Sequence, residues 1–307
     1  MPAHSLTGAP AAAGTTPDAR WLRRLTPPGR APAVRLICFP HAGGAAGAFA
    51  PLARALDPSV DALGVQYPGR QDRRHETPLD IPGLADRIAD ALTDDAFTDD
   101  APAHSAGGPY AFFGHSMGAL VAFETAARLR DRPGTGPVHL FLSGRLAPGL
   151  GPVPADRLEG DDALVARVLE LGGVSGEILA DPELKELVLV PLRADYRALR
   201  SYAWAGGPPL DLPCTVLTGD ADPLVPVGDA AAWARHTTGP TALRVFPGGH
   251  FYLADRAADV ARAVTADLAG APDPAPDTDS DNAAADTTDT TVTARPQDPA
   301  TRPRPRT

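Results

Sequence analysis

The fold is decided by one stretch of sequence, Tyr110-Ala111-Phe112-Phe113-Gly114-His115-Ser116-Met117-Gly118-Ala119-Leu120. An apolar, strand-like run precedes Gly114, and a helical pattern follows Ser116 as far as Leu129. A G-x-S-x-G pentapeptide between a strand and a helix forces a sharp turn, whose small flanking residues let the serine hydroxyl stand clear of the backbone. Glycine and serine are also common in ordinary turns, but this context favours Ser116 as a nucleophile. The side chain of His115 should then point away across the turn.

Strand-like runs and helical patterns alternate on both sides of this turn. We expect strands at residues 34–39, 60–66, 110–113, 138–143, 215–218 and 243–246, and helices at 48–56, 81–92, 117–129, 227–235 and 256–268. Such alternation predicts an α/β fold, in which a mostly parallel central sheet is flanked by helices on both faces.

Three segments depart from this alternation. Residues from about 150 to 207 have helical patterns at 163–171 and 183–199 without a clear strand, which indicates a helical lid insertion that controls entry to the site. Residues 1–32 are expected to be a flexible leader. Residues 271–307 are rich in Pro, Asp and Thr and hold almost no large apolar residue, so we expect a disordered tail. The predicted catalytic domain is therefore 33–270.

Composition limits the possible partners and compartments. The 307 residues are 43% hydrophobic and 21% charged, which suits one substantial globular core. A net charge of −10 argues against nucleic acid as a partner. Cys38 and Cys214 both lie in apolar runs, without disulfide or zinc spacing. We find no secretory signal and no run of membrane-spanning length, so we expect a cytoplasmic protein without membrane contact, and a monomer as the simplest state.

A serine nucleophile needs a base, and the base needs an acid that orients it. His250 is the best base, because it follows the last predicted strand on a loop that Gly248 and Gly249 make permissive. Asp222 and Asp220 both follow the strand that ends at about residue 218. We prefer Asp222, which reaches further past the strand end, and interpret Asp220 as a residue that stabilises the turn. The chain order Ser, Asp, His is typical of α/β-hydrolases.

Acyl transfer also needs hydrogen-bond donors aimed at the oxyanion that forms on the substrate. One should be the backbone N–H of Met117, directly after the nucleophile. The second should come from the loop after the first strand, which reads Phe39-Pro40-His41-Ala42-Gly43-Gly44. We assign it to Ala42, with Gly43 as the alternative.

Taken together, these residues resemble the type II thioesterases that accompany modular polyketide synthases and nonribosomal peptide synthetases. The matching blocks are 38–44, Gln66-Tyr67-Pro68-Gly69-Arg70-Gln71-Asp72-Arg73, 113–119, Leu192-Arg193-Ala194-Asp195-Tyr196, 219–223 and 246–253. The resemblance implies hydrolysis of acyl thioesters on the phosphopantetheine arms of carrier domains, without a metal or other cofactor. It places the triad on Ser116, Asp222 and His250, and the oxyanion donors on Met117 and Ala42.

Contacts with the substrate or the carrier are a further expectation. We assign them to His41, Tyr67, Arg70 and Arg73, and carrier domains are typically acidic, so Arg70, Arg73, Arg74 and Arg145 could form a docking patch. Apolar residues of the insertion, namely Leu164, Val168 and Leu187, could line an acyl chamber or belong to ordinary helix core. Three rival functions stay open: a general carboxylesterase or lipase, a non-catalytic protein that docks on a synthase, and an acyltransferase.

Overall fold

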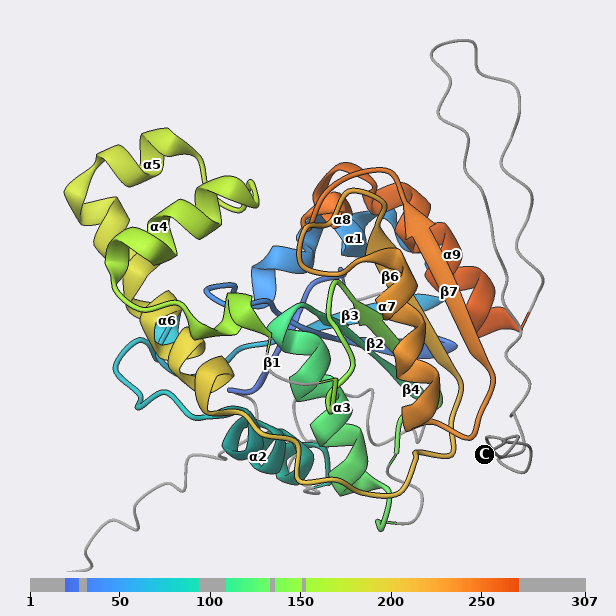
Figure 1. The fold of residues 1–307 in the computed structure, drawn as a ribbon. Helices are drawn as coiled ribbons and strands as arrows, with labels where there is room; N and C mark the ends of the chain where they lie inside the picture. Colours follow the sequence, from blue (N-terminus) through green and yellow to red (C-terminus); the bar gives the residue numbers. More distant parts are fainter. Residues whose placement is uncertain (1–19, 28–31, 94–108, 133–135, 151–152, 271–307) are drawn as a thin grey trace, which may run out of the picture.

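The computed structural model describes residues 20–27, 32–93, 109–132, 136–150 and 153–270 (Figure 1). The predicted tail at 271–307 and residues 1–19 of the predicted leader lie outside these ranges. Within them, no helix combines the length and the apolar character that crossing a membrane requires.

The described residues form a seven-stranded sheet at the centre of the molecule, in the order β1-β3-β2-β4-β5-β6-β7 (Figure 1). β1 pairs antiparallel with β3, and every other neighbouring pair is parallel. This confirms the predicted, mostly parallel sheet. The strands are β1 (Leu22–Arg24), β2 (Val34–Phe39), β3 (Val60–Val65), β4 (Tyr110–His115), β5 (Leu140–Ser143), β6 (Cys214–Gly219) and β7 (Thr241–Phe246).

Strand β1 corrects the prediction of a flexible leader over residues 1–32. Leu22 pairs with Val65 at the edge of the sheet. The neighbouring Trp21 is buried, and the guanidinium of Arg73 lies 4.2 Å from the centre of its indole ring. A short strand and one buried aromatic side chain therefore order this part of the leader. The polar and proline-containing sequence around it gave no sign of the strand.

Side chains alternate between the two faces of the sheet, as the pleat of a strand requires. In β4, Phe112 packs into the core on the face that carries α2 (Ile81–Thr93) and α3 (Met117–Leu129). Phe113 packs into the second core, which α1 (Ala50–Ala55) and α9 (Ala257–Ala269) cover. Helices thus flank both faces, and the strands between them are buried on both sides.

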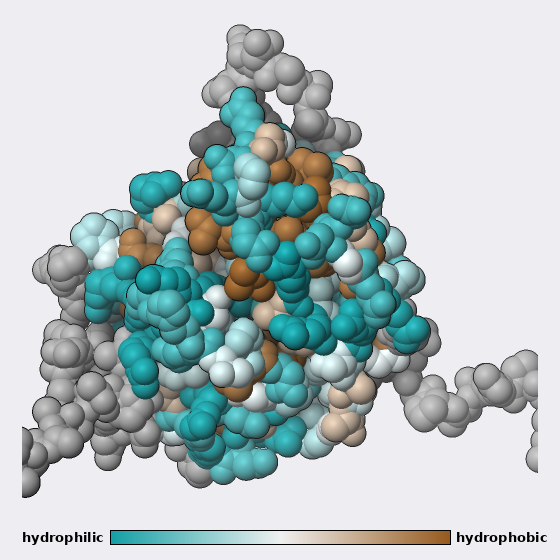
Figure 2. Space-filling model, turned by 90° about the vertical axis from the view of Figure 1, so that its left-hand side faces the viewer, coloured by the Kyte–Doolittle hydropathy of each residue, from teal (hydrophilic) through white to brown (hydrophobic). Residues whose placement is uncertain are grey.

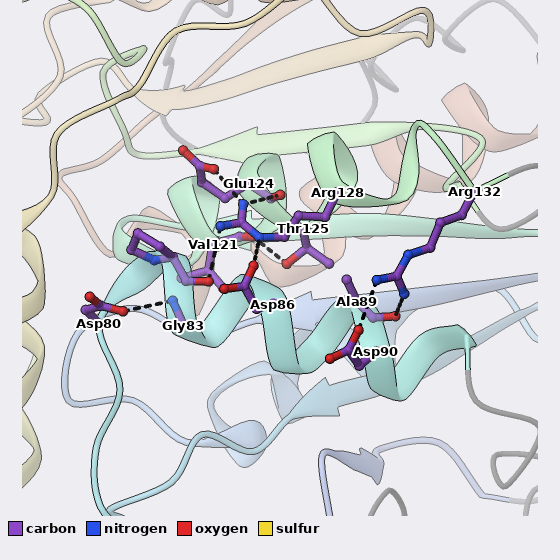
Figure 3. Close-up of polar contacts among 11 residues, drawn as sticks. Asp80, Gly83, Asp86, Ala89, Asp90, Val121, Glu124, Thr125, Arg128 and Arg132 are labelled. Carbon is purple, nitrogen blue, oxygen red and sulfur yellow. Dashed lines mark hydrogen bonds and ion pairs between the residues drawn. The ribbon is translucent and has the colours of Figure 1, made fainter.

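Two arginines connect α3 to α2: Arg128 at the end of α3, and Arg132 in the segment that follows it (Figure 3). Arg128 donates to the carboxylate of Asp86 and, at 2.7 Å, to that of Glu124. One turn later, Arg132 donates to Asp90 at 3.0 Å. Because such exposed ion pairs each contribute at most about 1 kcal/mol, their main effect is to fix how the two helices align. The helix that begins after Ser116 is thereby anchored along its outer side.

Between β5 and β6 the described residues hold helices and no strand of the sheet. Figure 1 shows α4 and α5 standing apart from the sheet at the upper left, while α6 runs down from them toward α2 and α3. α5 was not predicted, because five residues are too few to show a helical period; Ser175 caps it by accepting from the Ile178 N–H. The elements here are η4 (Pro154–Arg157), α4 (Asp161–Glu170), α5 (Gly176–Ala180) and α6 (Pro182–Ser201).

The remaining elements are short. The predicted helices at 48–56 and 227–235 are each split into a 3-10 turn and an α-helical part. The first is split into η1 (Ala46–Phe49) and α1, and the second into α7 (Val227–Ala230) and η5 (Ala231–His236). The other short elements are η2 (Gln71–Arg73) and α8 (Tyr252–Asp255).

Candidate active site

The site lies where the strand order reverses. β2 has β3 on one side and β4 on the other, and the helices that follow β2 and β4, α1 and α3, lie on opposite faces of the sheet. In open parallel sheets the loops at such a switch point separate and leave a crevice at the carboxyl ends of the strands. The loop after β2 and the turn after β4 meet at this crevice. The sheet topology therefore brings the predicted oxyanion loop next to Ser116.

The turn at Ser116 is strained and closely packed. Ser116 has φ 56° and ψ −120°, a conformation that side chains other than glycine rarely adopt. A Cβ on Gly114 would lie 2.4 Å from the Gly118 carbonyl oxygen, and one on Gly118 would lie 1.9 Å from the Phe39 carbonyl oxygen. Both glycines of the pentapeptide are therefore required by backbone contacts.

The structure brings Ser116, His250 and Asp222 together in one line. The Ser116 Oγ lies 3.0 Å from His250 Nε2, and His250 Nδ1 lies 2.8 Å from Asp222 Oδ2. In this arrangement the Nδ1–H donates to the carboxylate, so that Nε2 can accept the serine proton. The second oxygen of Asp222 accepts from the Leu224 N–H at 2.8 Å. Both side chains are buried.

The runner-up acid, Asp220, has a different position. It is exposed, and its Oδ1 accepts from the Gly248 N–H at 2.9 Å. This bond connects the loop after β6 to the loop that leads into His250. Asp220 thus stabilises the loops around the histidine and does not contact its ring.

The loop after β2 presents its amides in two directions. The Gly43 N–H donates to Asp195 Oδ2 at 2.7 Å, so the alternative oxyanion donor of the sequence analysis is already engaged. Among the described residues, neither the Ala42 N–H nor the Met117 N–H donates to another protein group. Both amides are therefore free of protein acceptors in the described residues, and their role as oxyanion donors stays a prediction.

We expected His115 to point away across the turn, but its side chain points into the site. Its ring lies beside that of His250, with 5.1 Å between the ring centres. Its Nδ1 is 2.9 Å from Ser143 Oγ, which in turn is 2.7 Å from the Tyr252 hydroxyl. Burial, and secondarily the neighbouring His250, hold the pKa of His115 well below its usual value. A neutral ring therefore supports His250 and does not oppose the charge that His250 gains when it takes a proton.

His41 lies at the edge of the site. Its half-buried ring packs edge-on against Phe251, the neighbour of His250, with 4.9 Å between the ring centres. Burial lowers the pKa of His41 to about 4, and the charges of His250 and Arg70 add to this effect. The imidazole is neutral at physiological pH. A contact between His41 and a substrate stays a prediction.

Tyr67, Arg70 and Arg73 lie in the interior of the protein. Tyr67 is fully buried, and each arginine side chain is only 5% exposed. Arg73 donates to the Gln66 carbonyl at 2.7 Å and pairs with Glu76. Contacts of these three residues with the substrate or the carrier stay a prediction, which their burial does not favour. The Tyr-Pro-Gly-Arg block shapes the interior.

Arg145, the fourth member of the predicted docking patch with Arg74, is also paired inside the protein. Its two terminal nitrogens donate to the two oxygens of Asp156, at 2.8 and 2.5 Å. The pair lies in the wall of a pocket of about 370 Å³ between the loop after β5, η4 and the end of α6, and no triad residue lines that pocket. Arg74 alone of the four is exposed.

The segment with α4 to α6 contacts the loops of the site at two glycines. A Cβ on Gly43 would lie 2.8 Å from the Leu192 side chain of α6, and one on Gly173 would lie 2.7 Å from the Phe251 ring. Of the apolar residues proposed to line a chamber, Leu164 and Val168 belong to the core. Leu187 is 70% exposed and belongs neither to a chamber nor to the core.

Sequence reasoning gave no role to Asp195, Ser143 or Tyr252. Asp195 is a carboxylate on the buried side of an amphipathic helix, which is a detectable signal because buried acids are rare unless paired. Ser143 ends a strand, and its contact with His115 depends on strand register. No local pattern reveals that contact.

Comparisons with known proteins agree with this geometry. The thioesterase domain family matches residues 34–268. Thioesterase PikA5 of Streptomyces venezuelae is 44% identical over 257 residues, covering 82% of this chain and 88% of that protein. The gramicidin S biosynthesis protein GrsT of Aneurinibacillus migulanus is 33% identical over 222 residues, covering 72% and 83%.

A solved structure extends the likeness to three dimensions. The type II thioesterase BorB, from the borrelidin biosynthetic cluster, matches with a TM-score of 0.69 and 41% identity, over 81% of this chain and 98% of that one. The chain therefore belongs to the thioesterase family, as a serine hydrolase of the α/β-hydrolase fold within the type II thioesterase group.

Proposed function

We propose that this protein hydrolyses acyl thioesters from the phosphopantetheine arms of carrier proteins, and so removes aberrant or stalled acyl groups during polyketide or nonribosomal peptide biosynthesis. The alignment of Ser116, His250 and Asp222 carries this proposal, because it is the geometry of an activated serine. The names of relatives support the setting: one belongs to gramicidin S biosynthesis and another to the borrelidin cluster.

In the acylation step, His250 Nε2 takes the proton of Ser116 as the Oγ attacks the thioester carbonyl carbon. The carbonyl oxygen becomes an oxyanion and accepts from the N–H groups of Met117 and Ala42. Asp222 stabilises the imidazolium through the Nδ1–H bond. The carbon–sulfur bond then breaks, and His250 gives the proton that it took from Ser116 to the leaving pantetheine sulfur, so that a free thiol departs and Nε2 is again a base.

In the deacylation step, a water molecule takes the place of the thiol. His250 removes a proton from it, and the resulting hydroxide attacks the acyl-enzyme carbonyl. The same two N–H groups hold the second oxyanion. The proton on His250 returns to Ser116 Oγ as the ester bond breaks, and the free acid is released.

We infer that α4, α5 and α6 form a lid, under whose edge the acyl arm enters. The contacts of Leu192 with Gly43 and of Gly173 with Phe251 support this, because they set the lid against both catalytic loops. His41 and Phe251 lie beside that contact. The whole triad comes from one chain, so we propose that the protein works as a monomer, in the cytoplasm.

Acyl release from a panel of loaded carrier proteins tests this function. Wild type and Ser116→Ala are compared on each carrier thioester, on the matched N-acetylcysteamine thioester and on the matched p-nitrophenyl ester. We expect kcat/KM to be highest for the carrier thioester and release to disappear in Ser116→Ala. Equal or better hydrolysis of the p-nitrophenyl ester would instead indicate a general esterase.

A further inference from the structure

Asp195, on the lid helix α6, reaches into the loop that presents the oxyanion donor. Its side chain is 4% exposed. One carboxylate oxygen accepts from the Gly43 N–H at 2.7 Å, and the other accepts from Arg70 Nη2 at 2.6 Å. Burial raises the pKa of Asp195, against the opposing effects of Arg70 and the Gly43 amide. A buried carboxylate is costly unless such donors are in place, so this position is tightly specified.

Arg70 continues the connection to the same loop. Its Nη1 donates to the Gly44 carbonyl at 2.5 Å, and its guanidinium lies 5.0 Å from the centre of the Tyr67 ring. The Tyr67 hydroxyl donates to the Pro40 carbonyl at 3.3 Å. The loop is therefore held at three backbone groups, which lie on both sides of Ala42.

Gly43 shows how narrow the permitted geometry is. It has φ 78°, in the left-handed region that favours glycine. Its N–H is turned toward Asp195, while a Cβ in its place would collide with Leu192 of the same lid helix. Because α6 supplies both contacts, the position of α6 and the conformation of this loop depend on each other.

We propose that Asp195 and Arg70 are positioning residues for the oxyanion site. Through the Gly43 N–H and the Gly44 carbonyl, this ion pair joins lid helix α6 to the loop that carries the Ala42 N–H, so the transition state is stabilised when α6 is seated on the core. The inference rests on the proposed role of Ala42 but not on the identity of the substrate. Oxyanion donors act over distances of about 3 Å, and a displacement of about 1 Å costs much of their effect.

Asp195→Asn tests the inference. Asparagine offers one acceptor oxygen and one NH₂ group, so it cannot accept from both Gly43 and Arg70. We expect kcat on a small N-acetylcysteamine thioester to fall about 10- to 100-fold, which is less than the loss of a whole oxyanion donor. KM should stay within about twofold. The affinity for an alkyl boronic acid, which forms a tetrahedral anion on Ser116, should fall by the same factor as kcat.

Asp267→Asn is the matched control. Asp267 is also a helix carboxylate of low exposure, and it accepts from Arg244 at 2.6 Å and from the Thr215 hydroxyl at 2.8 Å. Thr215 is near the start of β6, whereas the active site is at the strand ends. We expect Asp267→Asn to lower the melting temperature about as much as Asp195→Asn does, but to leave kcat unchanged.

The double variant Arg70→Met with Asp195→Leu separates positioning from stability. Replacing a buried ion pair with apolar side chains often restores stability, but it does not restore anchors for Gly43 and Gly44. We expect a melting temperature at or above that of Asp195→Asn, with kcat still about 10-fold or more below wild type. This variant also carries the test if Asp195→Asn does not fold.

Three results would overturn the inference: a folded Asp195→Asn within twofold of wild type in kcat, a double variant with near-normal kcat, or an equal loss of kcat in Asp267→Asn. A wild type that hydrolyses the small thioester but no carrier-bound one would refute the proposed function alone. The rate at which a fluorophosphonate labels Ser116 gives the same comparison of variants if no substrate is hydrolysed.

Discussion

The sheet around Ser116 and the lid helices differ in how far their apolar side chains are buried. All six residues of β4 are buried, and two apolar cores enclose the strand from both sides. The lid exposes large apolar side chains instead, among them Leu187 at 70% and Val190 at 47%. Figure 2, which views the molecule from the lid side, shows apolar patches among hydrophilic side chains. The triad is therefore built on strands that are buried from both sides, whereas the lid is buried on one side and exposed on the other.

This difference assigns separate physical tasks to the two regions. Ser116, Asp222 and His250 all follow strands of one rigid sheet, so their distances do not depend on the lid. A segment with one exposed side opens at lower free energy than a core strand does. We therefore expect variants in the core to change stability or abolish chemistry, and lid variants other than those of the buried Asp195–Arg70 pair to change activity with little effect on stability.

The largest expected effect is the loss of the nucleophile. Ser116→Ala should lower kcat by about 10⁴-fold or more, because no other group at the site can form the acyl-enzyme. Asp222→Asn should leave a measurable remnant, because His250 keeps its contact with Ser116. Turnover of an acyl thioester, with the melting temperature as a check on folding, measures both. Wild-type turnover in Ser116→Ala would exclude the assigned nucleophile.

Two glycines compare the regions directly. Gly118→Ala would drive a methyl group into the backbone carbonyl of Phe39, which cannot move without moving its strand. It should lower the free energy of unfolding by about 3 kcal/mol. Gly173→Ala in the lid meets only the Phe251 ring, which can move. We expect a loss of less than about 1 kcal/mol there, with kcat/KM reduced a few-fold. Urea unfolding and steady-state kinetics on both variants would contradict the comparison if Gly173→Ala proved the less stable.

Acid should lower the free energy of unfolding through buried histidines outside the lid. Burial lowers the pKa of His41 and of His139 to about 4 and that of His115 further, whereas residues 153–201 hold no histidine. Unfolded histidine titrates near pH 6.5. The unfolded state therefore binds more protons below that pH, and the free energy of unfolding should fall between pH 6.5 and 4 by up to about 1.4 kcal/mol per pH unit for each histidine.

Urea titrations at pH 7.5, 6.5, 5.5 and 4.5 measure this slope. From pH 7.5 to 6.5 each of these histidines should contribute only about 0.4 kcal/mol, because in the unfolded state it is mostly neutral at pH 7.5 and half protonated at pH 6.5. His139→Gln removes one of them far from Ser116, and should make the slope shallower by one histidine's share. A slope identical to that of wild type would show that His139 is protonated in the folded protein.

The smallest expected effect concerns the outer face of the lid. Leu187→Ala removes a side chain that is mostly in solvent, and should change the free energy of unfolding by less than about 0.5 kcal/mol. Leu120→Ala, on α3 and 1% exposed, makes the same chemical change in the core and should cost about 2–5 kcal/mol. Equal costs in urea unfolding would mean that Leu187 is covered in solution.

The core was predictable because local and tertiary preferences agree there. The bounds predicted for the helix after Ser116 and for the strand at 34–39 match α3 and β2. The pentapeptide, together with loops that follow strands, was enough to bring Ser116, Asp222 and His250 into one proposal. Strand β1 was missed because it depends on pairing with β3 and on the burial of Trp21, which no local pattern indicates.

The arginines show the limit of sequence reasoning at the site. Arg70 and Arg73 look like docking residues because arginine is usually exposed. Their burial depends on partners far along the chain, such as Asp195, which is 125 residues from Arg70. The orientation of His115 likewise depends on Ser143 and Tyr252. The missing information was in each case a long-range contact.

The left-handed backbone at Ser116 has a consequence for how the protein is maintained. A serine held at φ 56° costs free energy that glycine would not, so replacing the nucleophile with glycine would relax the turn while destroying the chemistry. Stability alone would thus favour an inert protein. A hydroxyl-bearing residue at this position therefore serves turnover at the expense of stability, and the strained backbone at Ser116 is part of that cost.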